Sequence, residues 1–265
     1  ILMELGFVTE NQVLEALADR LHLEIVDVAQ IPVNLKAVGM INRELAEKNL
    51  ILPVSVNEHS MVLVTNDPLN YFALEEVRQQ TGCHLEIQLS EEVPLKKAVS
   101  YYYAEVHARK AAKQANVGFS TTDIDELEIE NLDNPDEAPI IQLLNSLIER
   151  AIKAEASDIH IEPFEQETNV RMRIDGVVSE YVKIQKNIHG PLIARIKILA
   201  NLDIAEKRIP QDGHFRVALG DGQQVNIRVS VLPTVFGEKA VLRIMAATSH
   251  LDHADHFGMD EYSYN

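Results

Sequence analysis

The stretch DIHIEPFEQETNVRMRIDGVVSEYV, residues 158–182, decides the fold of the second half of this chain. Its apolar positions predict three short strands, at Asp158–Glu162, Val170–Ile174 and Val177–Val182. Asp175-Gly176 joins the last two strands, and this dipeptide between apolar runs is the strongest hairpin signal in the sequence. We therefore expect an antiparallel sheet in this region.

The segments on both sides of this stretch complete a domain over residues 138–248. Pro139 suits the first position of a helix, and the apolar stripe that follows it predicts a helix to about Ala154. The other expected elements are a helix at Ile188–Asn201, a hairpin of Phe215–Leu219 and Gln224–Val231 around Gly220-Asp221-Gly222, and a last strand at Ala240–Met245. This order describes an α+β domain with its helices on one face of the sheet.

Residues 1–103 predict a second, smaller domain of mixed helices and strands. Thr9 and Gln12 have the spacing of a capping box at the start of a helix. The remaining elements are expected as strands at Leu50–Val56, Met61–Thr65 and Leu85–Leu89 and helices at Tyr71–Thr81, ended by Gly82, and Val93–Tyr102. The fold class is therefore α+β, with two small sandwich-like domains.

Residues 104–137 differ in composition from both domains. Thr121–Glu137 holds eight acidic residues, no basic residue and few bulky apolar ones. Such a segment cannot bury enough apolar surface to offset the entropy of ordering it. We expect an acidic flexible linker here; the alternative is an acidic arm that docks on a basic partner.

The formal net charge of -17 is unevenly distributed. Residues 1–137 hold 10 Lys and Arg against 24 Asp and Glu, whereas residues 138–248 hold 14 against 13. An acidic first half opposes non-specific binding to nucleic acid or to anionic lipid, because both require a basic surface. Only the arginine-rich second domain could face a polyanion.

Three further features indicate a soluble cytoplasmic protein. The single Cys83 excludes an internal disulfide and fits a reducing compartment. No run approaches the roughly 18 apolar residues that a membrane span needs. The opening residues Ile1–Leu5 resemble no signal peptide, since they have neither a basic flank nor a cleavage site.

Five short motifs in the second domain occur in an informative order. They are Ala156–Pro163, Arg173–Gly176, Leu202–Gly213, Arg228–Ser230 and Gly237–Arg243. In this order, residues 138–248 closely resemble the middle domain of type II secretion and type IV pilus assembly ATPases (GspE/PilB-like). Residues 1–103 loosely resemble the variable N-terminal domain of that family, and residues 249–265 resemble its connector into the motor domain. The chain contains no G-x-x-x-x-G-K-[ST] phosphate-binding loop, so we expect it to have no catalytic residue of its own and not to hydrolyse ATP alone.

The resemblance implies a role for two arginines. Arg228 and Arg243 match positions that family members use to reach the phosphates of nucleotide held by the P-loop domain. The alternative from the residues alone is an ion pair with Asp212 or Glu238, or display on the solvent face of the sheet. Position 214 departs from the family, which usually has Arg there where this chain has His214.

The resemblance also implies the setting of the full protein. It would bind ATP and Mg²⁺, form a homo-hexamer, and attach to the inner membrane through the cytoplasmic domain of a platform subunit. The middle domain would be PAS-like. Type II secretion is the first expectation, because the first domain is short, and type IV pilus assembly is the alternative.

Other groups in the second domain have a less specific pattern. The basic residues Arg171, Arg173, Arg195, Lys197, Lys207 and Arg208 are expected to be interface or solvated charges. Asp158, His160 and Glu162 alternate on one strand and so face one side; we expect hydrogen-bonded interface groups rather than a metal or acid–base site. His250, His253 and His256 recur every third residue and suggest only adventitious metal binding, so no metal site is predicted.

The first domain has an alternative function. Residues 2–21 and 31–53 loosely resemble the two halves of a cyclic-di-GMP-binding module, but the chain lacks the Arg-Leu-Gly motif at its start. The module's usual glutamine would fall near Asp19, where an anion would oppose a phosphate. We therefore expect a docking module for the platform subunit; the alternative is a stabilising appendage with no partner.

Overall fold

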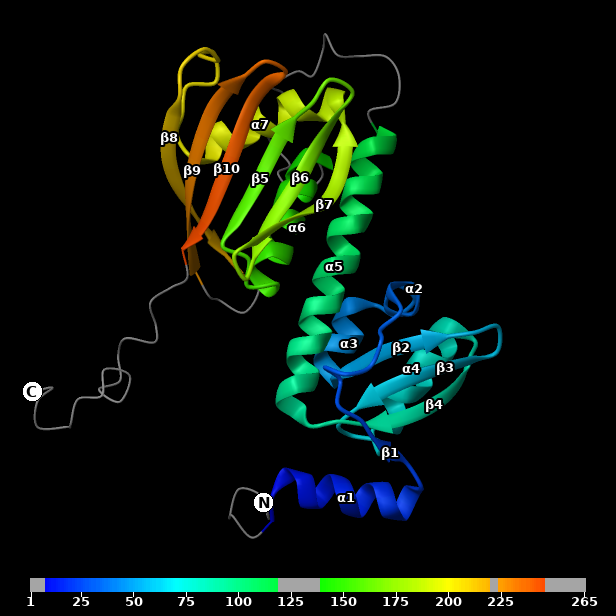
Figure 1. Ribbon diagram of the computed structural model, residues 1–265. Helices are drawn as coiled ribbons and strands as arrows, with labels where there is room; N and C mark the ends of the chain where they lie inside the picture. Colours follow the sequence, from blue (N-terminus) through cyan, green and yellow to red (C-terminus); the bar gives the residue numbers. More distant parts are fainter. Residues whose placement is uncertain (1–7, 119–138, 220–223, 246–265) are drawn as a thin grey trace, which may run out of the picture. The chain divides into compact units, whose positions relative to one another are not determined.

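The computed structural model describes residues 8–118, 139–219 and 224–245. The chain divides into two compact units, unit 1 (Ile1–Lys110) and unit 2 (Ala111–Asn265), and each is described separately (Figure 1). No described helix combines the length and the apolar content that crossing a bilayer requires.

Unit 1 is a four-stranded sheet with helices packed against it. Its elements are, in order, α1 (Glu10–Leu21), β1 (Glu24–Ile25), α2 (Leu35–Val38), α3 (Arg43–Asn49), β2 (Ile51–Val56), β3 (Ser60–Thr65), α4 (Tyr71–Thr81), β4 (His84–Leu89) and the first part of α5 (Glu92–Gly118), whose last residues, from Ala111, belong to unit 2. The strand order is β1-β4-β3-β2. β2 and β3 form an antiparallel hairpin, while β3 and β4 are parallel and α4 is the crossover between them.

Local sequence signals set the ends of these helices. The side chain of Thr9 accepts from Gln12 N, and that of Gln12 accepts from Thr9 N, so the predicted capping box is present. Asn70 caps α4, and Gly82 ends it with a positive φ of 68°. The core beneath is aliphatic, as the scarcity of aromatic residues predicts.

Unit 2 is a six-stranded antiparallel sheet covered by helices on one face. Its elements are α6 (Pro139–Lys153), β5 (Asp158–Pro163), β6 (Glu167–Ile174), β7 (Val177–Gln185), α7 (Lys186–Leu199), β8 (Gln211–Ala218), β9 (Gln224–Thr234) and β10 (Gly237–Met245). The strand order is β7-β6-β5-β10-β9-β8, so two three-stranded meanders join where β5 pairs with β10. The predicted α+β fold with an antiparallel second sheet is confirmed.

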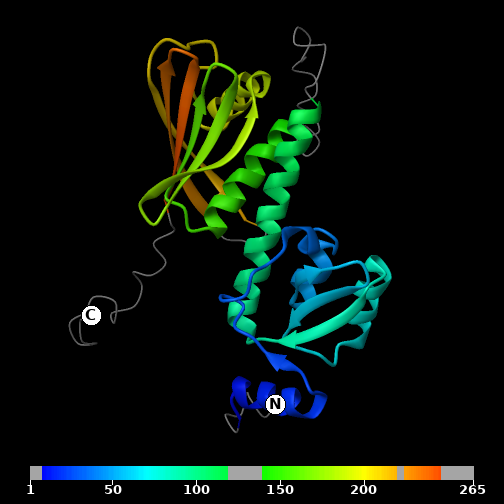
Figure 2. The same ribbon diagram turned by 45° about the vertical axis from the view of Figure 1, so that its right-hand side comes forward.

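Alternation along the strands separates a covered face from an open face. Inward residues such as Ile159, Ile161, Ala240 and Leu242 are fully buried with the apolar faces of α6 and α7. In the views of Figures 1 and 2 both helices lie on one side of this sheet. The other face carries charged side chains, among them the predicted residues Arg173, Arg228 and Arg243.

The helix α5 differs from the prediction. It continues to Gly118 instead of ending near Tyr102, so residues 104–118 are helical rather than part of a linker. Its small residues form a buried stripe at helical spacing: Ala104, Ala108, Ala111, Ala112 and Ala115. Alanine is the best helix former, so this stripe indicates a helix, whereas the prediction of a linker rested on composition alone. The rest of the expected linker, residues 119–137, and the predicted turn Gly220-Asp221-Gly222 lie outside the described residues.

Candidate functional site: an arginine row on the open face of unit 2

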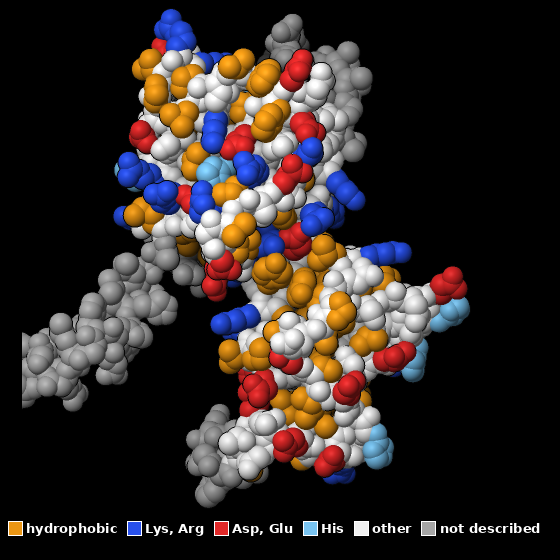
Figure 3. All heavy atoms as spheres, viewed as in Figure 1, with side chains coloured by type: hydrophobic (Ala, Val, Ile, Leu, Met, Phe, Trp, Pro, Cys, Tyr) orange, Lys and Arg blue, Asp and Glu red, His pale blue; other side chains and the backbone are white. Residues whose placement is uncertain are grey.

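One cross-strand row on the open face brings together most of the predicted site residues. The register aligns Arg173 of β6 with Asp158 of β5, Asp158 with Arg243 of β10, Arg243 with Arg228 of β9, and Arg228 with His214 of β8. We call these five residues the arginine row. Figure 3 views this face and shows Lys and Arg side chains interspersed with acidic ones over unit 2.

Asp158 is the anchor of the row. Its side chain is only 5% exposed; Oδ1 accepts a hydrogen bond from Arg243 Nε at 2.9 Å, and Oδ2 lies 3.3 Å from Arg173 Nε. Ser157 Oγ also donates to Oδ2 at 2.9 Å. Burial raises the pKa of this carboxyl, but the hydrogen bonds from Arg243 and Ser157 outweigh burial and bring the pKa below its ordinary value.

Arg228 is the open end of the row. It is exposed, and within the described residues its side chain has no hydrogen-bond or ion-pair partner. The partners considered from the sequence are engaged elsewhere: Asp212 accepts from Ser230 Oγ at 2.5 Å, and Glu238 pairs with Lys197 at 2.6 Å. Arg228 lies directly opposite Arg243, and two like charges in that position repel each other.

A second carboxylate on β5, that of Glu162, is also paired with cations of both neighbouring strands. Glu162 lies 2.7 Å from Lys239 Nζ and accepts from Arg171 Nη1 at 3.3 Å, so it has a cation on each neighbouring strand. Burial raises the pKa of Glu162, but its bonds with Lys239 and Arg171 lower that pKa below the ordinary value.

His160 lies between the two carboxylates. Its pKa is lowered by burial and by the charge of Lys239, so it is neutral at pH 7. The three alternating residues do face one side, as the strand period predicts. Asp158 and Glu162 are held by ion pairs, whereas Nε2 of His160 is buried without a hydrogen-bond partner among the described residues. No group of three or more His, Cys, Asp or Glu suited to a metal occurs in the described parts of the chain; His250, His253 and His256 lie outside them.

Lys197 does not lie where the sequence pattern predicts. It was expected among interface or solvated charges, but it is 1% exposed and lies on the covered face, where Nζ is 2.6 Å from Glu238 Oε1. Nζ also donates to Glu206 O at 2.6 Å. Lys197 therefore joins three segments: α7, the loop that leads to β8, and the start of β10.

The long motif Leu202–Gly213 forms a loop held by its own hydrogen bonds. Gln211 Nε2 donates to Asp203 O and Glu206 O, and the Glu206 carboxylate accepts from Arg208 Nε and Nη2. Bonds from Arg208 lower the pKa of Glu206 to about 2. Arg208 is thus exposed but paired, and it lies outside the arginine row.

Arg195 is also outside the row. It belongs to α7, which covers the opposite face of the sheet, and its Nε is buried without a hydrogen-bond partner among the described residues. Of the predicted basic set, the structure therefore brings only Arg173 to Arg228 and Arg243.

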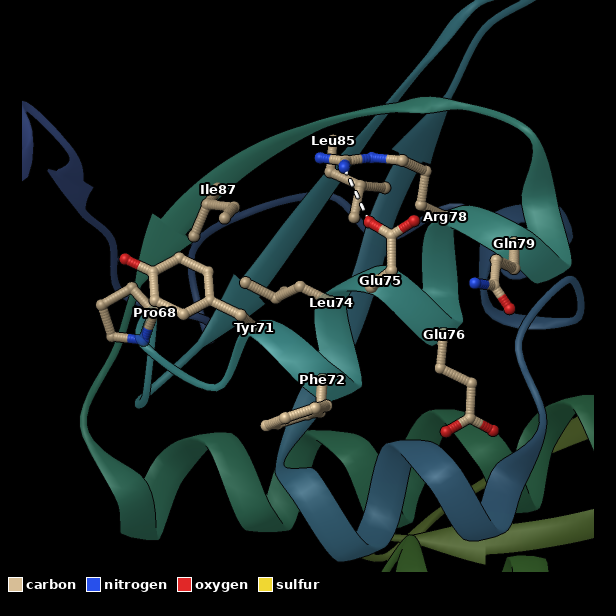
Figure 4. Close-up of a pocket in the computed structure, with 10 residues that line it drawn as sticks. All are labelled: Pro68, Tyr71, Phe72, Leu74, Glu75, Glu76, Arg78, Gln79, Leu85 and Ile87. Atoms are coloured by element: carbon tan, nitrogen blue, oxygen red, sulfur yellow. Dashed lines mark hydrogen bonds and ion pairs between the residues drawn. The ribbon is translucent and has the colours of Figure 1, made fainter.

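Unit 1 contains a separate hollow of about 850 Å³, shown in Figure 4. Leu85 and Ile87 of β4 line it together with residues of α4, including Tyr71 and Phe72. The side chain of Phe72 is 93% exposed. Arg78, the cation of the hollow, is paired with Glu75 at 2.8 Å. The lining is mixed, because Glu75, Glu76, Arg78 and Gln79 join the apolar and aromatic side chains, and its cation is already paired.

These features define unit 2 as a domain that displays guanidinium groups on the open face of its sheet. The five side chains of the row are guanidinium, carboxylate and imidazole groups, and its guanidinium groups are suited to bind and orient an anion. Comparison with known proteins identifies the class.

Residues 133–265 match the family described as "Type II/IV secretion system protein", and residues 21–109 match the MshEN domain. The type IV pilus assembly ATPase PilB of Myxococcus xanthus is 34% identical over 248 residues, which cover 92% of this chain and 44% of that protein. Type II secretion system protein E of Xanthomonas campestris pv. campestris is also 34% identical, over 252 residues that cover 92% of this chain and 44% of that protein. The chain belongs to the type II/IV secretion system protein family, which confirms the resemblance stated from the sequence.

Solved structures match a smaller part of the chain. "Structure of MshE with cdg" shares 27% sequence identity, covers 38% of this chain and 74% of that chain, and has a TM-score of 0.36. The N-terminal domain of XpsE shares 25% identity, covers 37% of this chain and 69% of that chain, and has a TM-score of 0.33. The chain spans less than half the length of the two relatives PilB and protein E.

Proposed function

We propose that this chain is the N-terminal coupling part of a cytoplasmic ATPase that powers pseudopilus or pilus assembly. Family membership supports the class of machine. The role proposed for unit 2 is to contact nucleotide phosphates, and it rests on one observation. The guanidinium of Arg228 is exposed beside Arg243 and has no partner in the described residues. An arginine displayed in this way is suited to complete an anion site that lies on another domain.

The proposed mechanism uses Arg228 and Arg243 as phosphate contacts. In the full protein a P-loop domain holds ATP and Mg²⁺, and the two arginines reach the phosphates when that domain approaches the open face of unit 2. Because the charge of the transferred phosphoryl group is spread over its oxygens in the transition state, guanidinium donors that contact those oxygens stabilise it. Since the contact exists only while the phosphates are present, nucleotide state and domain position become coupled.

Unit 1 is proposed to dock on the cytoplasmic domain of an inner-membrane platform subunit, and the full protein to act as a hexameric ring. The hollow lined by Tyr71 and Phe72 is the surface to test first, because exposed aromatic side chains are frequent anchors of protein interfaces. Phe72→Ala is expected to weaken binding to the purified platform domain in a pull-down. Unchanged binding would exclude this surface.

The arginine contacts are tested by ATPase kinetics of the full-length protein. Arg228→Ala and Arg243→Ala are each expected to lower kcat/KM by about tenfold or more, because each removes a charge-assisted contact to phosphate. Lys183→Ala is the matched control, since Lys183 is an exposed cation of the same sheet that pairs with Glu167. The phosphate contact would be contradicted if all three variants lowered kcat/KM equally. It would also be contradicted if the arginine variants lost thermal stability in proportion to their loss of activity.

The second candidate concerns unit 1 alone and is binding of cyclic-di-GMP. The match of residues 21–109 to the MshEN domain favours testing it, while the exposed carboxylate of Asp19 near the expected phosphate opposes it. Titration calorimetry of this chain with cyclic-di-GMP separates the two. Binding that Asp19→Gln strengthens would favour a sensor, and absence of heat would leave docking as the role of unit 1.

A further inference from the structure

Asp158 holds Arg243 in a way that leaves the end of its guanidinium group free. The hydrogen bond from Arg243 to Asp158 passes through Nε at 2.9 Å, and the Arg243 side chain remains 66% exposed. Its two terminal amino groups donate no hydrogen bond within the described residues. A guanidinium has five donors, so one held through Nε can still offer its end to an anion.

The neighbouring residues explain why Arg243 needs such an anchor. Arg228 lies directly opposite on β9, and the repulsion between these like charges would drive the two side chains apart. On its other side Arg243 faces Asp158 on β5, the anion that counters this repulsion. We propose that Asp158 is a positioning residue that fixes the guanidinium of Arg243 beside that of Arg228, so that both reach one phosphate group.

Asp158 is itself fixed on three sides. Its strand β5 is central in the sheet, between β6 and β10. Oδ2 is occupied by Ser157 Oγ and Arg173, and Arg173 is further tied by Nη1 to the carbonyl oxygen of Gly176 at 2.9 Å. A buried carboxylate with this many partners cannot follow a mobile side chain, so Arg243 adapts to Asp158 and not the reverse.

Glu162 supplies a comparison within the same strand. It also lies between two cations on β6 and β10, and its side chain is similarly covered, at 14% exposure. However, neither Arg171 nor Lys239 belongs to the arginine row, and the position opposite Lys239 on β9 is the apolar Leu232. Loss of Glu162 therefore removes an equivalent pair of ionic contacts without touching the proposed phosphate site.

The proposal rests on the proposed function and is tested in the full-length protein by steady-state ATP hydrolysis. Asp158→Asn is expected to raise KM for ATP by about three- to tenfold, because a released guanidinium must be ordered each time the phosphates bind. Glu162→Gln is expected to leave KM unchanged. In the double variant Asp158→Asn with Arg243→Ala, KM should equal that of Arg243→Ala alone, since Asp158 acts only through Arg243.

Thermal unfolding of both single variants provides the structural control. If both variants lose a comparable amount of Tm but only Asp158→Asn changes KM, the result supports Asp158 as the residue that positions Arg243. Equal KM values for Asp158→Asn and Glu162→Gln, or additive effects in the double variant, overturn it while leaving the proposed function intact. If Arg243→Ala itself leaves kcat/KM unchanged, the proposed function fails, and the positioning role fails with it.

Discussion

Replacement of Lys197 by Met is expected to destabilise unit 2 strongly. Lys197 is 1% exposed, its Nζ lies 2.6 Å from the Glu238 carboxylate, and the Glu238 side chain is 9% exposed. The variant would leave that carboxylate buried without its cation and Glu206 O without its donor. Breaking a buried pair from one side costs about 3–5 kcal/mol, which corresponds to a fall in Tm of roughly 10 °C for a domain of this size.

Urea unfolding of the 265-residue chain, followed by circular dichroism, measures this loss. The double variant Lys197→Met with Glu238→Leu should recover most of it and lie within about 1–2 kcal/mol of the parent, because an apolar pair of similar volume leaves no charge unpaired. A loss below about 1 kcal/mol for Lys197→Met alone, or a double variant as unstable as the sum of the two single ones, would refute the argument from burial.

Three smaller predictions concern single positions. Gly213→Ala should cost about 1–3 kcal/mol in urea unfolding, because a Cβ there would lie 2.6 Å from the backbone oxygen of Ala200. Gly82→Ala should cost only about 1 kcal/mol, since its φ of 68° is strained for alanine but the space around it is open. His189 donates through Nε2 to Glu238 O at 2.8 Å, and burial lowers its pKa. The fold therefore favours neutral His189, so stability falls as the pH drops below the unfolded pKa of 6.5. His160 contributes a slope of the same sign, so His189→Leu should reduce but not abolish the slope of urea midpoints between pH 7.5 and 5.5.

Local signals in the sequence predicted local structure well. The turn at Asp175-Gly176 follows from two residues that tolerate positive φ, and the structure places them at 49° and 80°. The capping box at Thr9 follows in the same way from residues within one helical turn. Each of these features depends on neighbours in the sequence, and so it can be predicted without knowledge of the fold.

The arginine row could not be predicted, because it depends on which distant strands pair. The sequence placed Arg228 and Arg243 on strands, but only the β5–β10 pairing brings Asp158 to Arg243. Nothing near Arg243 in the sequence indicates that partner. The row therefore follows from the topology of the sheet, which residue patterns alone left open.

The burial of Lys197 was missed for a different reason. A lysine on an amphipathic helix is usually solvated, so its residue type predicted exposure although its position on the helix predicted burial. Lys197 lies one residue after Ile196 and four after Ile193, both buried, so helical periodicity did place it on the covered face. Its acidic partner Glu238 is distant in the sequence and gave no signal.

The pairing of β5 with the last strand also constrains how the protein is made. During synthesis on a ribosome, β5, β6 and β7 emerge first, yet one edge of β5 has no neighbour until Gly237–Met245 has left the exit tunnel. A nascent chain that pauses before this point exposes an unpaired edge next to the apolar faces of Ile159 and Ile161, which is the arrangement from which aggregation starts. Fragments that stop short of β10 should therefore depend on chaperones or be degraded, whereas those that include it can close the sheet.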